Sequence, residues 1–331
     1  MNASLKQAAT ERSGASGGGL RRRASRPGGS ALLAVFWSIM VLTLAISGWF
    51  FWLQQRVQEH GEDARGAEAM AMAYSGYAVA SHPKVDRYSS LLQAEPLPGM
   101  GYRVTIESEG KKINIKVMLA QILSDEKKGL LQFSEAYKFL NRWLEEVIGV
   151  EPDARARLMD CLLDYVDGDT LTRLNGQEDS PTYHPTNRPI ENLDELKRIP
   201  GLEPLTNSTG WKDSLTLLSI GPLDLMEIHE DLMILLPGFG VAQVQQVLRT
   251  RAGADQVPGT EDDRGMVSAV QKYFDGMNLT KEQKSLAKVG NEPTERWVCE
   301  GYSGKVVRQL QVVVRKSTGG TAKTQILSWI E

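Results

Sequence analysis

The stretch SALLAVFWSIMVLTLAISGWFFWL, from Ser30 to Leu53, contains no charged side chain and lies between Arg26 and Arg56. Roughly 20 apolar residues in one helix, each adding about 1.5 Å, are enough to cross the hydrocarbon core of a bilayer. We therefore expect one transmembrane helix that tethers the rest of the chain to a membrane.

Positive charge precedes this stretch, at Arg21, Arg22, Arg23 and Arg26. Because basic residues stay on the cytoplasmic side, the sequence predicts a cytoplasmic N-terminus and an exported C-terminal part. A cleaved secretory signal is the alternative. The apolar run is longer than a typical signal core, however, and no small-x-small cleavage site follows between Trp49 and Gln55.

The net charge of −3 is unevenly distributed along the chain. Residues 1–29 hold six basic side chains against Glu11, or +5, so the remainder carries −8. An acidic exported part is poorly suited to wrap nucleic acid, whose phosphates need a basic surface. Cys161 and Cys299 have no metal-ligand or redox spacing; we expect two buried free thiols, with a disulfide as the alternative in an oxidising compartment.

The pattern of the remaining residues predicts an α+β fold. Helix formers continue the apolar helix to His82, before Pro83. Period-two alternation predicts strands in 83–119, with Glu109-Gly110 as the turn of a hairpin, and again in 256–331. Residues 120–255 repeat apolar side chains every three or four positions, as helices do. We expect a long helix packed on an antiparallel sheet, with a large all-α insertion of two small helix-hairpin-helix or SAM-like subdomains.

A long polar loop between about 164 and 188 is the candidate binding site. Calcium takes six to eight oxygen ligands, and carboxylates held together without a cation repel each other. The ranked candidate ligands are Asp169, Glu178, Asp179 and Asp167; Asp164 also lies in this acidic segment. The spacing is not that of an EF-hand, and a solvated acidic loop remains the alternative from the residues alone.

Several motifs resemble the minor pseudopilin K family of the type II secretion system, also called general secretion pathway protein K. They are the basic leader that ends in glycine before SALLAVFW, the segment EGKKINIKVML, and above all LLDYVDGDTLTRLNGQEDSPTYHPTNRPIENLDELKRIPG. The family's INVNTA-like segment is matched only loosely, by GPLDLMEIHEDLMILLPG. The resemblance covers nearly the full chain and implies a pilin-like α+β fold.

The resemblance also implies how the chain is processed. Prepilin peptidase would cut between Gly29 and Ser30, remove residues 1–29 as a leader peptide and methylate the new terminus, so that Ala34 becomes the fifth mature residue. Most pilin-like subunits have glutamate there, and the K subunit lacks it. The resemblance further implies calcium in the acidic loop, an inner-membrane anchor with a periplasmic globular domain, and the minor pseudopilins I and J, with H below them, as partners.

These observations predict a non-enzymatic assembly subunit at the tip of the pseudopilus, with 30–82 as the transmembrane and amphipathic helix and the insertion capping the structure. We expect neither nucleic acid nor a small-molecule substrate. Two alternatives remain: a membrane-anchored DNA-binding protein that uses LLPGFGVAQVQQVLRTRAG as a helix-hairpin-helix element, and an anchored hydrolase that uses the carboxylates. No catalytic residue is predicted, because none of the four histidines is placed near a nucleophile signature.

Overall fold

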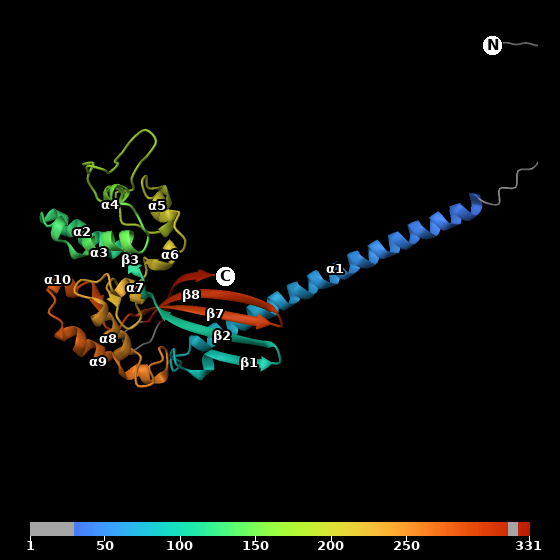
Figure 1. Cartoon of the computed structure of the whole chain (residues 1–331). Coiled ribbons are helices and arrows are strands. Elements are labelled where there is room, and N and C mark those ends of the chain that lie inside the picture. Colours follow the sequence, from blue (N-terminus) through green and yellow to red (C-terminus); the bar gives the residue numbers. More distant parts are fainter. Residues whose placement is uncertain (1–29, 317–323) are drawn as a thin grey trace, which may run out of the picture. The chain divides into compact units, whose positions relative to one another are not determined.

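The computed structural model describes residues 30–316 and 324–331, which fall into two compact units divided after Gly61. The predicted leader, including Gly29 of the expected cleavage site, lies outside the described residues. Helix α1 spans Ser30–Ala80 (Figure 1). It is long and apolar enough, by length and composition, to cross a membrane, and the side chains of residues 31–56 are all exposed.

The second unit contains a five-stranded antiparallel sheet (Figure 1). Its order is β1-β2-β7-β8-β9, and its strands are β1 (Gln93–Leu97), β2 (Met100–Ser108), β7 (Thr294–Ser303), β8 (Val306–Lys316) and β9 (Thr324–Ile330). Gly99 and Gly304 have φ of +73° and +59°, which fits the tight turns that follow β1 and β7.

The last turns of α1 pack closely on this sheet through small residues. A Cβ added to Gly301 of β7 would lie 1.9 Å from the carbonyl oxygen of Ala69 and 2.3 Å from the amide nitrogen of Ala73. Glycine is therefore required for the contact. Trp297, Cys299 and other apolar side chains of the sheet are buried in the core beneath the helix. The predicted fold class, a long helix on an antiparallel sheet with a helical insertion, is confirmed.

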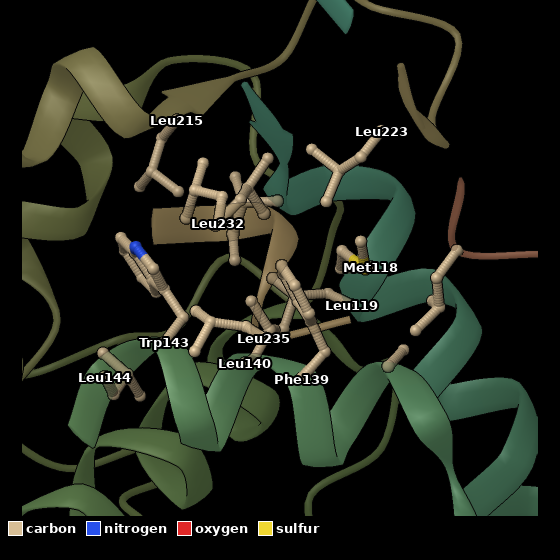
Figure 2. Close-up of a cluster of buried hydrophobic side chains, with 14 of the residues drawn as sticks. Met118, Leu119, Phe139, Leu140, Trp143, Leu144, Leu215, Leu223, Leu232 and Leu235 are labelled. Atoms are coloured by element: carbon tan, nitrogen blue, oxygen red, sulfur yellow. The ribbon is translucent and has the colours of Figure 1, made fainter. Parts of the chain in front are cut away.

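The helical insertion has one large core of its own. Figure 2 shows Phe139, Leu140 and Trp143 of one helix grouped with Met118 and Leu119 of another. The helices are α2 (Ile115–Lys127), α3 (Glu135–Glu146), α4 (Pro152–Val166), α5 (Glu203–Thr206), α6 (Trp211–Ser214), α7 (Glu230–Met233), α8 (Val241–Arg251), α9 (Val267–Gly276) and α10 (Lys281–Lys284).

Short elements connect these helices. They are the 3-10 helices η1 (Ser90–Leu92), η2 (Glu109–Lys111), η3 (Leu131–Phe133), η4 (Leu193–Arg198) and η5 (Glu261–Gly265), and the two-residue strands β3 (Ile113–Asn114), β4 (Leu215–Thr216), β5 (Leu223–Asp224) and β6 (Ala287–Lys288). Helix α2 thus begins before the expected range 120–255, and α9 and α10 lie after it. The domain boundaries stay a prediction.

The expected hairpin at Glu109-Gly110 is wrong. Residues 109–111 form η2, and the short β3 that follows pairs in parallel with β4 rather than with β2. The cause is Glu109, whose buried carboxylate pairs with Arg296 at 2.6 Å and so holds the chain at the end of the sheet. Asn114 then caps α2 by accepting a hydrogen bond from the amide of Val117.

Both cysteines are buried and free. Cys161 lies in the core of the helical insertion and Cys299 in the core beneath α1. The expectation of two free thiols is confirmed. Burial raises the pKa of the Cys299 thiol to about 12 and also raises that of Cys161, which keeps both in the unreactive protonated form.

Candidate metal centre

The C-terminal end of α4 and the loop after it bring three carboxylates together. Asp164 lies in the last turn of α4 and Asp167 is the residue that caps this helix. Residues three apart on a helix share a face, so the two side chains point the same way. Glu178 comes from the loop, and one oxygen from each of the three residues lies within 4.8 Å of the others.

All three carboxylates are buried: Asp164 is 0% exposed, Asp167 6% and Glu178 8%. Burial raises the pKa of Glu178, and the charges of Asp164, Asp167 and Asp169 raise it further. Burial also raises the pKa of Asp167, although its hydrogen bond with Arg173 acts in the opposite direction. The protein therefore holds acidic groups where their charges repel each other.

Arg173 is the positive charge that the chain itself supplies to this cluster. Its Nη1 donates to Asp164 Oδ1 at 2.6 Å and to Asp167 Oδ2 at 2.5 Å, while its Nη2 donates to Glu126 Oε2 at 2.5 Å. Burial opposes the charge of the guanidinium, but these hydrogen bonds outweigh it and raise the pKa of Arg173. One guanidinium thus donates hydrogen bonds to three carboxylates, those of Asp164, Asp167 and Glu126, and makes none to Glu178.

Three buried carboxylate oxygens of this cluster lack a partner among the described residues: both oxygens of Glu178 and Oδ1 of Asp167. A buried acceptor without a hydrogen bond costs free energy, and a charged one costs more. Oxygens of carboxylates are the ligands that a hard divalent cation prefers. The residues present therefore fit a cation such as calcium, which would take up the acceptors that Arg173 leaves free.

The loop is held against α4 by its backbone as well as by its side chains. The amide of Asn175 donates to Asp160 Oδ2 at 3.1 Å, and the amide of Arg173 donates to Asp164 Oδ2 at 3.3 Å. A Cβ at Gly176 would lie 1.9 Å from Asp164 Oδ2. Glycine at this position allows the loop to pass directly over the cluster.

Two of the four predicted ligands, Asp167 and Glu178, belong to this cluster, while Asp169 and Asp179 lie outside it. Asp169 is exposed and accepts from the amide of Leu171 at 2.9 Å; Asp179 is exposed and pairs with His184. Asp164, which the sequence places in the acidic segment but which is not among the four ranked ligands, belongs to the cluster. Its spacing of three from Asp167 at a helix end is the signal that would have identified it.

The helix-hairpin-helix segment has two arginines, of which Arg249 is exposed and Arg251 is bonded within the fold. Arg251, at the end of α8, donates to the carbonyl oxygens of Ile228 at 2.8 Å and Leu225 at 3.1 Å. Its guanidinium therefore holds the hairpin to the preceding segment. This contact gives Arg251 a structural role.

The comparison with protein families agrees with the motif resemblance. Residues 113–208, which include α2 to α4, the acidic loop and α5, match the family described as type II secretion system (T2SS), protein K. The comparison with curated proteins found no match. A chain from the crystal structure of the GspK-GspI-GspJ complex of the enterotoxigenic Escherichia coli type 2 secretion system is similar, with 15% identity and a TM-score of 0.46; the match covers 84% of this chain and 97% of that one.

Proposed function

We propose that this chain is the minor pseudopilin K of a type II secretion system, because its residues 113–208 match the protein K family of that system. The observation that carries the proposal is that family match together with the uncharged stretch Ser30 to Leu53 of the N-terminal helix, in which Ala34 is the fifth residue after the expected cleavage. An anchor and an assembly module are what a subunit of a membrane-based fibre needs. Its role is structural rather than enzymatic.

The N-terminal helix is the anchor and the assembly surface. Residues 30–53 cross the inner membrane, with the globular part in the periplasm. An unpaired glutamate in hydrocarbon would seek the terminal amine of a neighbouring subunit, because an uncompensated charge there costs several kcal/mol. A subunit with Ala34 has no such requirement for a further partner, which suits a position at the end of the fibre.

The helical insertion gives a steric reason for a tip position. Its bulk would hinder the addition of another subunit above it, so one copy per fibre is expected. The partners are the minor pseudopilins I and J, with H below them, as the family resemblance implies. Such a tip complex would start assembly of the pseudopilus and support protein export across the outer membrane.

The acidic cluster binds calcium as a structural ion. Asp164, Asp167 and Glu178 are the ligands that the geometry favours, and Asp169 and Asp179 are those predicted from the sequence in addition. The ion would neutralise buried charge and fix the loop on α4. Calorimetric titration with CaCl₂ should show binding that Glu178→Gln abolishes, while Asp179→Asn distinguishes the two ligand sets.

Mass spectrometry of the mature N-terminus tests the proposed class. A methylated Ser30 is the expected result, and a chain that still begins at Met1 in cells with active prepilin peptidase would contradict it. Co-purification with subunits I and J from the same organism tests the assembly role. The matched control is Ala34→Glu, which restores the acid common in pilin-like subunits and should alter incorporation without altering the fold of residues 62–331.

A further inference from the structure

Part of strand β2 has a free edge. Strand β1 begins at Gln93, which pairs with Arg103, so residues Val104–Ser108 of β2 are paired only with β7. No other backbone hydrogen bond reaches these residues within 30–316 and 324–331. Because successive residues of a strand direct their N–H and C=O groups to opposite sides, about half of these groups point away from β7 and are free to pair.

This edge opens onto a cleft of about 960 Å³. Its lining includes Val104, Thr105 and Ile106, which are consecutive in β2. Because successive side chains of a strand point to opposite faces, a cleft lined by all three reaches the edge of the strand rather than one face alone. The cleft is also lined by residues of the helical insertion, among them Met226, Glu227, Arg251 and Asp263. The cleft therefore lies beside the part of β2 that β1 does not pair with.

Asp263, in η5, lines this cleft and has a buried carboxylate oxygen without a hydrogen-bond partner in the described part of the chain. The side chain is 6% exposed; its Oδ2 accepts from the amide of Gly259 at 2.6 Å, while its Oδ1 has no partner. The guanidinium groups near it are bonded elsewhere: Arg251 to backbone carbonyl oxygens and Arg264 to Asp86. A buried acceptor of this kind is stabilised by a donor, and most by a cationic one.

The remaining charges of the cleft limit what can occupy it. Among the lining residues, three arginines balance three carboxylates: Arg87, Arg103 and Arg251 against Glu95, Glu227 and Asp263. A polyanion would gain little from such a lining. An uncharged main chain with free N–H and C=O groups fits both the neutral lining and the free strand edge.

We propose that the free edge of β2 binds an extended peptide segment of a partner protein, which adds a strand beside Val104–Ser108 and places a lysine or arginine side chain against Asp263. Five residues of strand, at about 3.3 Å each, match the unpaired length of β2. Main-chain hydrogen bonds give affinity, and the contact with Asp263 gives specificity for a basic residue. This site is separate from the acidic cluster and from the membrane helix.

The test uses the full chain in detergent micelles and a fluorescent seven-residue peptide that alternates threonine and valine, with lysine at its centre and both ends blocked. Fluorescence anisotropy should show saturable binding. Replacing the central lysine by glutamate, or Asp263→Asn in the protein, should weaken binding about tenfold, as expected for loss of a charge-assisted hydrogen bond. The control variant Glu261→Gln, at an exposed acid two residues away, should leave binding unchanged.

A second measurement separates strand addition from charge attraction. The same lysine peptide with alternate amides N-methylated cannot pair with a strand edge, so it should not bind, and hydrogen exchange in residues 104–108 should slow only with the unmethylated peptide. If the lysine peptide fails to bind at millimolar concentration, or if the methylated peptide or the Asp263→Asn variant binds equally well, the proposal is wrong. The methylated peptide keeps the test valid even if the variant does not fold.

Discussion

Arg173 competes with the proposed cation for the same carboxylates, and Arg173→Gln tests this competition. In the structure its guanidinium, 15% exposed, pairs with Asp164, Asp167 and Glu126 at 2.5 to 2.6 Å. Removing one partner of a buried ion pair costs about 3–5 kcal/mol, because the other charge stays buried without compensation. Without calcium, we therefore expect the variant to lose about that amount of stability.

Calcium should restore much of this loss. At 100 times its dissociation constant, a ligand that binds only the folded state stabilises it by about 2.7 kcal/mol. Because the variant no longer has a tethered cation at Asp164 and Asp167, it should also bind calcium more tightly than the wild type. The rise in melting temperature on adding calcium should consequently be larger in Arg173→Gln than in the wild type.

The assay is thermal unfolding of the full chain in micelles, in EDTA and in CaCl₂. For about 150–250 residues, 1 kcal/mol corresponds to roughly 2–4 °C, so the loss in EDTA should be about 6–20 °C. Arg188→Gln is the matched control, since Arg188 lies in the same loop but is exposed and pairs at the surface with Glu191. An equal loss of stability with and without calcium would refute the reasoning.

Three further changes test the cluster and the contact between α1 and the sheet. Gly176→Ala places a methyl carbon 1.9 Å from Asp164 Oδ2, so we expect loss of calcium binding in calorimetry and about 1–3 kcal/mol lower stability in thermal unfolding. Burial raises the pKa of Glu178, so this pKa is higher in the folded than in the unfolded protein. The protonated side chain therefore favours the folded state; this stabilisation is fully present below the unfolded pKa and is lost as the pH rises through the folded pKa. Glu178→Gln should thus melt higher than the wild type in EDTA near pH 7, lose this advantage on acidification, and melt lower in calcium; a pH-independent difference would contradict the assignment. Gly301→Ala places a methyl carbon 1.9 Å from the carbonyl oxygen of Ala69 and should cost about 3 kcal/mol or more; an unchanged melting temperature would show that the helix does not pack as described.

The sequence indicated the elements but not all of their pairings. Periodicity identified the apolar helix and the strands of the C-terminal part because side-chain spacing depends only on local geometry. The same period of two extended the strand pattern through Ile113 and Ile115, although Ile115, Met118 and Leu119 are also buried at helical spacing. The choice between the two depends on Glu109, whose partner Arg296 is 187 residues away and invisible to a local pattern.

The acidic cluster shows the same limit. Asp167 and Glu178 could be proposed from the composition of the loop, because several acids close together need compensation. The ranking of the candidate ligands could not be predicted, since it depends on which side chains of the loop point into the cluster. Asp169 has the same chemistry as Asp167 but lies exposed two residues further on, where the chain has left the helix. Arg173, which decides how much negative charge remains, showed no pattern in the sequence.

The position of the insertion explains how one chain can hold both parts without disrupting the sheet. The chain leaves the sheet after Ser108 and returns at Thr294, and Ser108 pairs with Glu295 in the register of β2 and β7. Exit and entry are therefore neighbours on adjacent strands, as they would be in a short hairpin. The entropic cost of closing a loop grows only slowly with its length, so a large domain can replace a turn at this point.

Buried polar contacts then fix the insertion at this junction. Glu109 pairs with Arg296 and accepts from Thr216, while Arg315 of β8 donates to the carbonyl oxygen of Leu218 at 2.6 Å. Each contact joins a residue at the end of the sheet to one in the insertion or at its start. Because breaking a buried charged pair costs several kcal/mol, the helical part is held to the sheet at a defined position. A rigid junction of this kind is what the proposed steric cap requires, since a freely hinged insertion would leave the end of the fibre open to another subunit.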